Sequence, residues 1–332
     1  CSSDLLWVIV ATALLARFVL VFATPVLSDD IFRYVWDGRV AAAGINPYRY
    51  APGAEALASL RDGVIWPAIN HPSVPTIYPP VAQYLFEFNA HLGGGVVGLK
   101  TLLVGVESAA VAVCVWWCRR HGVEWSAIAA GVALYALNPL VIVEVAYSGH
   151  IDVVAWSLLI VALVVWRCPE SEGDICRRGW RLAAIAGLVG LSIGAKFLSL
   201  AVLPFLLFDG WVARGAGWWS RVWARRAAMS AGAVVVVALT YLPYAAVGGS
   251  LFDGFGTYAA SWRNNDGGYR LVRAGAEWSL ESGVDCSAAS AKRGRVRCED
   301  GQVLVALEGL NPAFRALGWA KQWRGETLSN TM

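Results

Sequence analysis

The stretch LLWVIVATALLARFVLVFAT, residues 5–24, is an apolar run with the length that an α-helix needs to cross a bilayer, about 20 residues. One charged residue, Arg17, interrupts it. The chain of 332 residues is 57% hydrophobic and 15% charged, whereas soluble domains carry about 25% charged residues. This composition predicts a polytopic membrane protein. A net charge of +3 is too small to indicate a nucleic-acid partner.

Further apolar stretches follow the first, and several of them are too short to cross a bilayer alone. They cover residues 96–117, 126–147, 151–166, 182–195, 198–208 and 227–247. We therefore expect an all-α fold, a polytopic transmembrane helix bundle, over residues 1–272. A polar extracytoplasmic tail is expected over residues 273–332. Because this tail has no apolar run, the chain is either truncated or carries a divergent outer segment.

Arginine and tryptophan together predict the orientation in the membrane. Both residue types cluster in three short connections, near residues 120, 170 and 220. Basic loops stay in the cytoplasm, and tryptophan prefers the level of the lipid headgroups. Four segments then lie on the opposite, outer face: residues 25–80, the turn SGHID at 148–152, the turn at Lys196 and the chain after about residue 248. We expect the chemistry on this extracytoplasmic side of the plasma membrane.

The stretch SDDIFRYVWDGR, residues 28–39, follows the first apolar run. Read as a helix capped by Ser28, it places two adjacent aspartates in the first turn. Arg33 and Asp37 continue the polar face in line with Asp29, opposite an apolar stripe, and we expect both to bind substrate. This pattern is typical of an interfacial helix that lies flat on the membrane.

The two aspartates, Asp29 and Asp30, have two interpretations. As helix-start charges they contribute about 0.3–1 kcal/mol to helix stability and nothing more. As a catalytic pair, one of them serves as a general base, because adjacent carboxylates raise each other's affinity for a proton. The residues alone do not choose between these roles.

The loop that follows, up to about residue 86, is rich in proline, tyrosine and asparagine. Its prolines exclude a plain helix and indicate a rigid, packed loop. Asn46, Tyr48, Asn70, His71 and Tyr78 offer polar and aromatic surfaces of the kind that bind sugar. The loop is either a structural lid or a substrate-binding surface, and His71 is alternatively a phosphate or metal ligand.

The outer turns carry further ionisable residues. Glu144, His150 and Asp152 surround the SGHID turn, and ionisable groups at membrane depth indicate function by default. Asp152 is alternatively a helix N-cap. Lys196 is expected as a lone cation at the membrane edge, either binding a lipid phosphate or extending to the interface.

Two more pairs of residues complete the candidates. Arg263 and Asn265 follow the last apolar stretch and are expected to return over the outer face, where the arginine binds phosphate. Lys100 and Glu107 lie two turns apart on one helical face. We expect them to be buried structural partners.

Four segments resemble the multispanning GT-C class of glycosyltransferases. They are SDDIFRYVWDGRVAAAGINPYRYAP (28–52), INHPSVPTIYPPVAQ (69–83), ALNPLVIVEVAYSGHID (136–152) and AKFLSLAVLPFLL (195–207). The resemblance covers roughly residues 5–272. It is closest to bacterial polyprenyl-phosphate-mannose-dependent mannosyltransferases and relatives of glycosyltransferase family 87.

This resemblance implies transfer of a hexose, most often mannose, from a polyprenyl-phosphate donor to a glycan or glycolipid acceptor, with inversion at the anomeric carbon. The membrane lipid is then a further partner. Asp29 or Asp30 would be the base, with Asp29 favoured, and Lys196, His150 and Arg263 would surround the donor phosphate. The class includes members with and without a divalent metal, Mg or Mn, so no cofactor is assigned. The alternatives are a transporter or flippase of lipid-linked sugars and a non-catalytic membrane scaffold.

Overall fold

The computed structural model describes residues 2–167, 175–204, 216–261, 296–299 and 302–305. The chain divides into two compact units, Cys1–Leu251 and Phe252–Met332. The boundary expected near residue 272 lies outside the described residues, and so do the candidates Arg263 and Asn265. Their placement stays a prediction.

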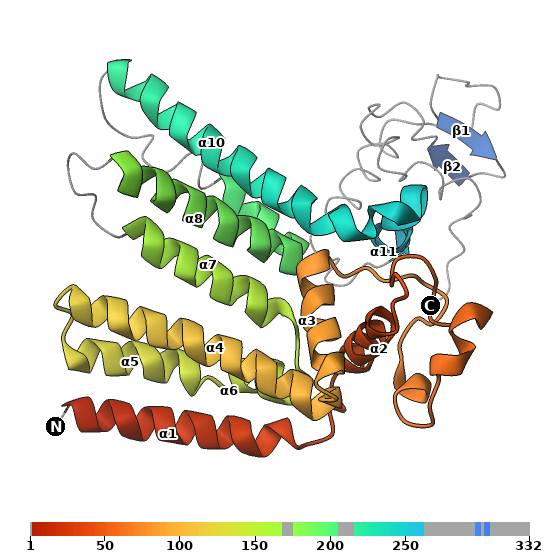
Figure 1. The fold of residues 1–332 in the computed structure, drawn as a ribbon, viewed down its shortest axis with the longest axis horizontal. Coiled ribbons are helices and arrows are strands. Elements are labelled where there is room, and N and C mark those ends of the chain that lie inside the picture. Colours follow the sequence, from red (N-terminus) through yellow and green to blue (C-terminus); the bar gives the residue numbers. More distant parts are fainter. Residues whose placement is uncertain (1, 168–174, 205–215, 262–295, 300–301, 306–332) are drawn as a thin grey trace. The chain divides into compact units, whose positions relative to one another are not determined.

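The first unit is helical in all its described elements. Its longer helices run side by side in Figure 1: α1 (Ser2–Val21), α4 (Gly95–Arg120), α5 (Trp125–Ala136), α7 (Asp152–Arg167), α8 (Ile175–Ala195) and α10 (Ala216–Tyr241). Across one end of this bundle lie α2 (Asp30–Ala42) and α3 (Pro80–His91). Short helical segments complete it: η1 (Glu55–Leu60), η2 (Trp66–Ala68), α6 (Pro139–Ile142), the π-helix η3 (Val143–Ser148), η4 (Phe197–Ala201) and η5 (Leu242–Phe252).

The second unit contains one described helix and one described hairpin. The helix is α11 (Asp253–Ser261). The strands β1 (Val296–Glu299) and β2 (Gln302–Val305) pair antiparallel, with Val296 opposite Val305.

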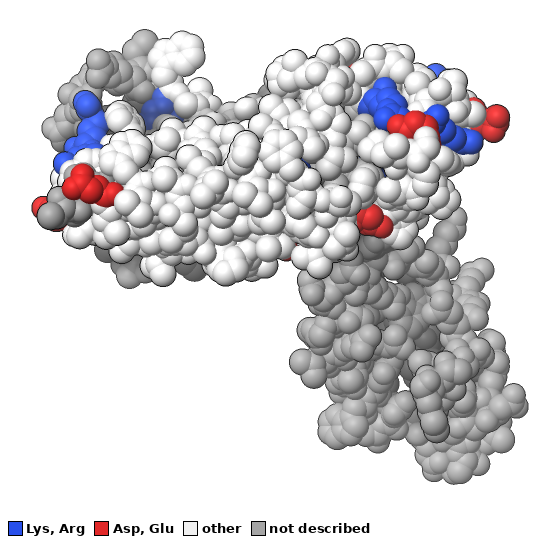
Figure 2. All heavy atoms as spheres, turned by 90° about the horizontal axis from the view of Figure 1, so that it is seen from below, with Lys and Arg blue, Asp and Glu red and all other residues white. Residues whose placement is uncertain are grey.

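Among the described residues, three helical segments are long and apolar enough to cross a membrane: Asp4–Val21, Gly95–Arg120 and Arg226–Ala246. A fourth span arises if α5 and the α6–η3 segment, which meet at a bend of 57°, are taken together. On the face shown in Figure 2, charged side chains gather at the two ends of the bundle, and the surface between them is uncharged. The predicted all-α polytopic membrane bundle is confirmed.

The connections at the end covered by α2 and α3 lie close together. The segment after α1, the turn between η3 and α7 and the turn between α8 and η4 all meet there. Hydrogen bonds join them: Ser28 contacts His150, and Asp152 contacts Lys196. The convergence of these polar segments on one end of the bundle is as predicted.

A buried ion pair ties α1 to the middle of the bundle. Arg17 donates to both carboxylate oxygens of Glu107 in α4, at 2.7 and 2.9 Å, and the two side chains are only 3% and 2% exposed. A third donation, at 2.7 Å, goes to the carbonyl oxygen of Ala136, the last residue of α5. The N–H of Leu140 would normally serve that carbonyl, but the side chain of Asn138 accepts it instead. Arg17 therefore satisfies the carbonyl left open where the span breaks.

Lys100 and Glu107 are buried, as expected, but they are not partners of each other. Glu107 pairs with Arg17. The ammonium group of Lys100 donates to the carbonyl oxygens of Ala23, at 2.7 Å, and Leu20, at 3.5 Å. These carbonyls belong to the C-terminal end of α1, where a cation is favourable. The two buried charged residues of α4, Lys100 and Glu107, thus bind α1 and the residues just after it.

The change Arg17→Leu leaves Glu107 as a buried carboxylate without its cation. We expect it to lower the free energy of unfolding by about 3–5 kcal/mol. The double variant Arg17→Leu/Glu107→Leu removes both charges and should recover most of that loss. Thermal unfolding in detergent measures both, with the exposed α1 position Thr12→Val as a control expected to change little. A double variant as unstable as the single one would contradict this role for the pair.

Candidate active site

The acidic pair lies where α2 begins. Helix α2 starts at Asp30, and its N-cap position is Asp29 rather than Ser28, which the sequence favoured. Ser28 still contributes, because its hydroxyl oxygen accepts a hydrogen bond from the backbone N–H of Asp30 at 3.3 Å. Asp29 is exposed and Asp30 is half-buried. The two carboxylates therefore stand at an accessible edge of the bundle end.

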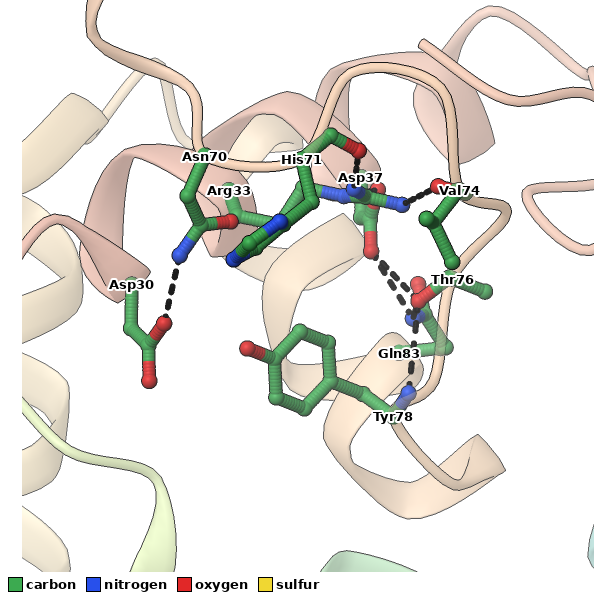
Figure 3. Close-up of polar contacts among 9 residues, drawn as sticks. All are labelled: Asp30, Arg33, Asp37, Asn70, His71, Val74, Thr76, Tyr78 and Gln83. Atoms are coloured by element: carbon green, nitrogen blue, oxygen red, sulfur yellow. Dashed lines mark hydrogen bonds and ion pairs between the residues drawn. The ribbon is translucent and has the colours of Figure 1, made fainter. Parts of the chain in front are cut away.

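One amide side chain bridges both carboxylates. The Nδ2 group of Asn70 donates to Oδ1 of Asp29 at 3.0 Å and to Oδ1 of Asp30 at 2.7 Å. Figure 3 shows Asn70 on the loop that crosses α2, with its amide pointing at Asp30. Hydrogen bonds to charged groups are stronger than neutral ones, so this contact holds the pair and the loop together.

A buried network fixes this loop on α2. The guanidinium of Arg33 pairs with Asp37 at 2.9 Å and donates to the backbone oxygens of His71, at 3.3 Å, and Val74, at 2.9 Å. The other carboxylate oxygen of Asp37 accepts from the hydroxyl of Thr76 at 2.5 Å and from the amide of Gln83 at 3.3 Å. Figure 3 shows this network. Arg33 and Asp37 are 4% and 2% exposed.

These contacts correct the expected role of the polar face of α2. The sequence predicted an accessible polar face on which Arg33 and Asp37 bind substrate, and the interfacial position of the helix stays a prediction. In the structure the loop covers that face, and α2 is buried along most of its length. Arg33 and Asp37 bind the protein itself and hold the loop in place.

The remaining surface of α2 packs closely on α3. A side chain at Gly38 would collide with the backbone carbonyl of Phe86, so glycine is required at this crossing. Tyr34 stacks on the ring of Phe86, with centroids 4.7 Å apart, and meets Tyr78 edge-on at 4.8 Å. Burial raises the pKa of Tyr34, and the neighbouring Tyr78, Asp30 and Asp152 raise it further.

On the other side of the acidic pair, a chain of hydrogen bonds runs from the turn after η3. The Nδ1 atom of His150 contacts the carboxylate of Glu144, and its Nε2 atom lies 3.0 Å from the hydroxyl of Ser28. With the ring proton on Nδ1, His150 donates to Glu144 and accepts from Ser28. The turn is pressed against α2, because Gly149 has φ +74° and a side chain there would collide with Ile31.

Lys196 is not the lone cation that the sequence predicted. Its ammonium group forms an ion pair with Asp152 at 2.9 Å, and both side chains are about one third exposed, 34% and 36%. The pair connects the start of α7 to the end of α8. A phosphate at this position would have to share Lys196 with Asp152.

The other predicted substrate-binding residues differ in how they are placed. Tyr48 and Tyr78 are 3% and 7% exposed, and the hydroxyl of Tyr48 donates to the carbonyl of Tyr78. Asn46 donates to the carbonyl of Tyr244 at 3.1 Å. His71 has an exposed side chain and a left-handed backbone, with φ +44°.

The structure thus brings Asp29 and Asp30 together with His150, and it places Asp152 with Lys196 nearby. The sequence reasoning missed the bridging role of Asn70 and the supporting roles of Thr76 and Gln83. All three lie in the segment 69–83, and hydrogen-bond partners so distant in sequence leave no periodic signal. Within the described residues, no group of three His, Cys, Asp or Glu side chains could hold a metal ion, so we assign no step to Mg or Mn.

Comparison with known proteins gives one family. The sequence model described as alpha-(1->6)-mannopyranosyltransferase, N-terminal domain, matches residues 6–213, more than half of the chain. The matched segment contains the acidic pair with Asn70, the Arg33–Asp37 network and the contacts of His150 and Lys196, whereas Tyr244, which Asn46 contacts, lies beyond it. No curated protein and no solved structure matches the chain.

The Arg33–Asp37 network yields a stability prediction. Asp37→Asn removes the charge that compensates buried Arg33, and its amide opposes the donor of Gln83. We expect a loss of about 3 kcal/mol in the free energy of unfolding and faster proteolysis of the loop over α2. The matched control is Asp62→Asn, because Asp62 pairs with Arg39 at 2.7 Å but both side chains are about one third exposed. That change should cost below about 1 kcal/mol. Equal losses in both variants would contradict the network's role.

Proposed function

This chain belongs to the alpha-(1->6)-mannopyranosyltransferase family and is a membrane glycosyltransferase that moves mannose from a sugar donor to an acceptor, and we propose that its donor is a polyprenyl-phosphate mannose. We further propose that transfer occurs at the extracytoplasmic face of the plasma membrane, with an aspartate base and inversion at the anomeric carbon. The observation that carries this proposal is the accessible pair Asp29–Asp30, bridged by Asn70 at the end of a membrane bundle.

A base for a sugar hydroxyl must be ionised and within reach of the acceptor. Asn70 donates to both carboxylates and holds them in place at the accessible edge. Asp29 is the exposed member of the pair, so we propose Asp29 as the base and Asp30 as its partner. The alignment of Asp29 with Arg33 and Asp37, which first favoured it, no longer supports this choice, because those two residues bind each other.

In the proposed reaction the acceptor hydroxyl gives its proton to the Asp29 carboxylate while its oxygen attacks the anomeric carbon. The bond from that carbon to the phosphate oxygen breaks on the opposite face, and polyprenyl phosphate leaves. Lys196 and His150 are at the same end of the bundle and are the proposed partners of this phosphate. A cation placed where negative charge develops lowers the barrier.

The distribution of arginine supports the proposed orientation. Arg119 and Arg120 end α4 at the end of the bundle opposite the acidic pair, and each lies over a tryptophan ring, at 4.1 and 5.9 Å. Arg167 ends α7 at the same end. Basic residues retained on the cytoplasmic side would place the acidic pair outside. A donor anchored in the outer leaflet reaches a site on that side by lateral diffusion. The proposed polyprenyl-linked donor is consistent with this position of the site.

Asp29→Asn and Asp30→Asn test the proposed base. Because general base catalysis contributes about 10²–10⁴-fold, we expect Asp29→Asn to reduce transfer at least 100-fold, with a smaller or equal loss for Asp30→Asn. The assay uses membranes supplied with polyprenyl-phosphate mannose and detects the product by mass. Asp62→Asn, an exposed carboxylate on the same loop region, is the control and should remain active.

Full activity in both variants would exclude the aspartate base. Transfer from a nucleotide-linked mannose, with none from the polyprenyl-phosphate donor, would exclude the proposed donor. Movement of the lipid-linked sugar across the membrane without product would favour a flippase.

A further inference from the structure

The acidic pair is held from two directions, by a chain of contacts through His150 on one side and by Asn70, which the proposed reaction does not use, on the other. On one side, Glu144 orients His150, which contacts Ser28, and Ser28 accepts from the N–H of Asp30. That chain fixes the backbone at the start of α2. On the other side, Asn70 contacts the carboxylates themselves, at 3.0 and 2.7 Å.

The hydrogen bonds from Asn70 reduce the repulsion between the carboxylates of Asp29 and Asp30. Adjacent carboxylates repel each other, and the repulsion favours uptake of a proton by one of them. A protonated carboxyl cannot serve as a base. One NH₂ group that donates to both oxygens offsets the repulsion without adding a charge that would compete for the donor phosphate. It also fixes the direction in which each carboxylate points.

Asn70 is held in place rather than free to rotate away. The next residues of its loop are bound to the buried side chain of Arg33 through the backbone oxygens of His71 and Val74. Thr76 and Gln83 then bind Asp37. This arrangement supplies the amide in its bonding position before substrate arrives, so little ordering remains during the reaction.

From this geometry we propose that Asn70 is a positioning residue of the mannosyl transfer, which keeps Asp29 and Asp30 both ionised and aimed at the acceptor. The inference rests on the proposed aspartate base. The Arg33–Asp37 network acts through Asn70 by holding its loop on α2. Asn70 neither accepts a proton nor bonds to the sugar in this role.

Other ionisable groups around the pair are part of its environment and stay unchanged in the test. Tyr34 and Tyr78 face Asp30 from α2 and from the loop before α3. His150 faces Ser28 from the turn after η3, and Asp152, paired with Lys196, approaches Tyr34 from α7. Replacing Asn70 alters the donors on the carboxylates and none of these groups.

The experiment measures the pH dependence of kcat for mannose transfer by the full chain, with Asn70→Ala and Asn70→Asp. Loss of the amide should move the acid limb of the profile to higher pH by about one unit or more. Asn70→Asp has nearly the same shape as the native residue but adds a third carboxylate. It should therefore fold normally and move the acid limb at least as far in the same direction. The acid limb of kcat reports the base in the enzyme–substrate complex.

Asn89→Ala is the matched control. Asn89 carries the same amide group, buried where that of Asn70 is half-buried, and it donates to the carbonyl of Gly95 at 2.9 Å, between α3 and α4. Its loss should reduce thermal stability and leave the acid limb where it is. An equal shift in this control would show that general loosening, not the bridge, moves the profile.

Two outcomes overturn different statements. If Asp29→Asn and Asp30→Asn abolish transfer but Asn70→Asp keeps the wild-type acid limb, the positioning role is wrong and the aspartate base stands. If both aspartate variants keep full activity, the base itself is wrong, whatever the Asn70 variants do. Loss of kcat at all pH values alike, without a shift in Asn70→Asp, also contradicts the positioning role.

Discussion

The ion pair between Arg33 and Asp37 is the constraint on which the candidate site depends. Removing two charges from water costs more than their mutual attraction returns unless further hydrogen bonds complete both groups. Those bonds come from the segment 71–83, through two backbone oxygens, a hydroxyl and an amide. The segment cannot leave α2 without stranding a buried charge. Asn70 and the acidic pair keep their mutual distance as a result.

Buried polar groups inside the bundle also need hydrogen-bond partners, but there the groups are backbone carbonyls rather than an ion pair. In lipid no water can complete a backbone group, so a broken helix needs a donor from another segment. Arg17 supplies this donor where α5 ends at Ala136, and Lys100 serves the carbonyls at the end of α1. Arg17 and Lys100 disfavour membrane insertion, but they make an irregular span possible. That span ends at the turn with His150, which lies next to the acidic pair.

Much of the helical architecture follows from the sequence, whereas the side-chain pairs that join distant segments do not. Apolar run lengths and arginine-rich connections predict the helices and the end on which the polar turns meet. Periodicity also shows that Arg33 and Asp37 share a face, but it cannot show that a distant loop covers that face. Lys196 and Asp152 are 44 residues apart, and Asn70 and Asp30 are 40 apart. Partners at such separations are set by packing, which the local pattern does not encode.

The pairing of Arg17 with Glu107 also has a consequence for synthesis of the protein. The two residues are 90 positions apart, and a ribosome adds about 5–20 residues per second, so the partner emerges about 5–18 seconds later. An arginine at the centre of a span costs about 2.5–3.5 kcal/mol on insertion scales. During that interval α1 carries an uncompensated charge in the nascent chain. The buried pair with Glu107 can therefore form only after α4 has been synthesised, and until then Arg17 lacks this partner.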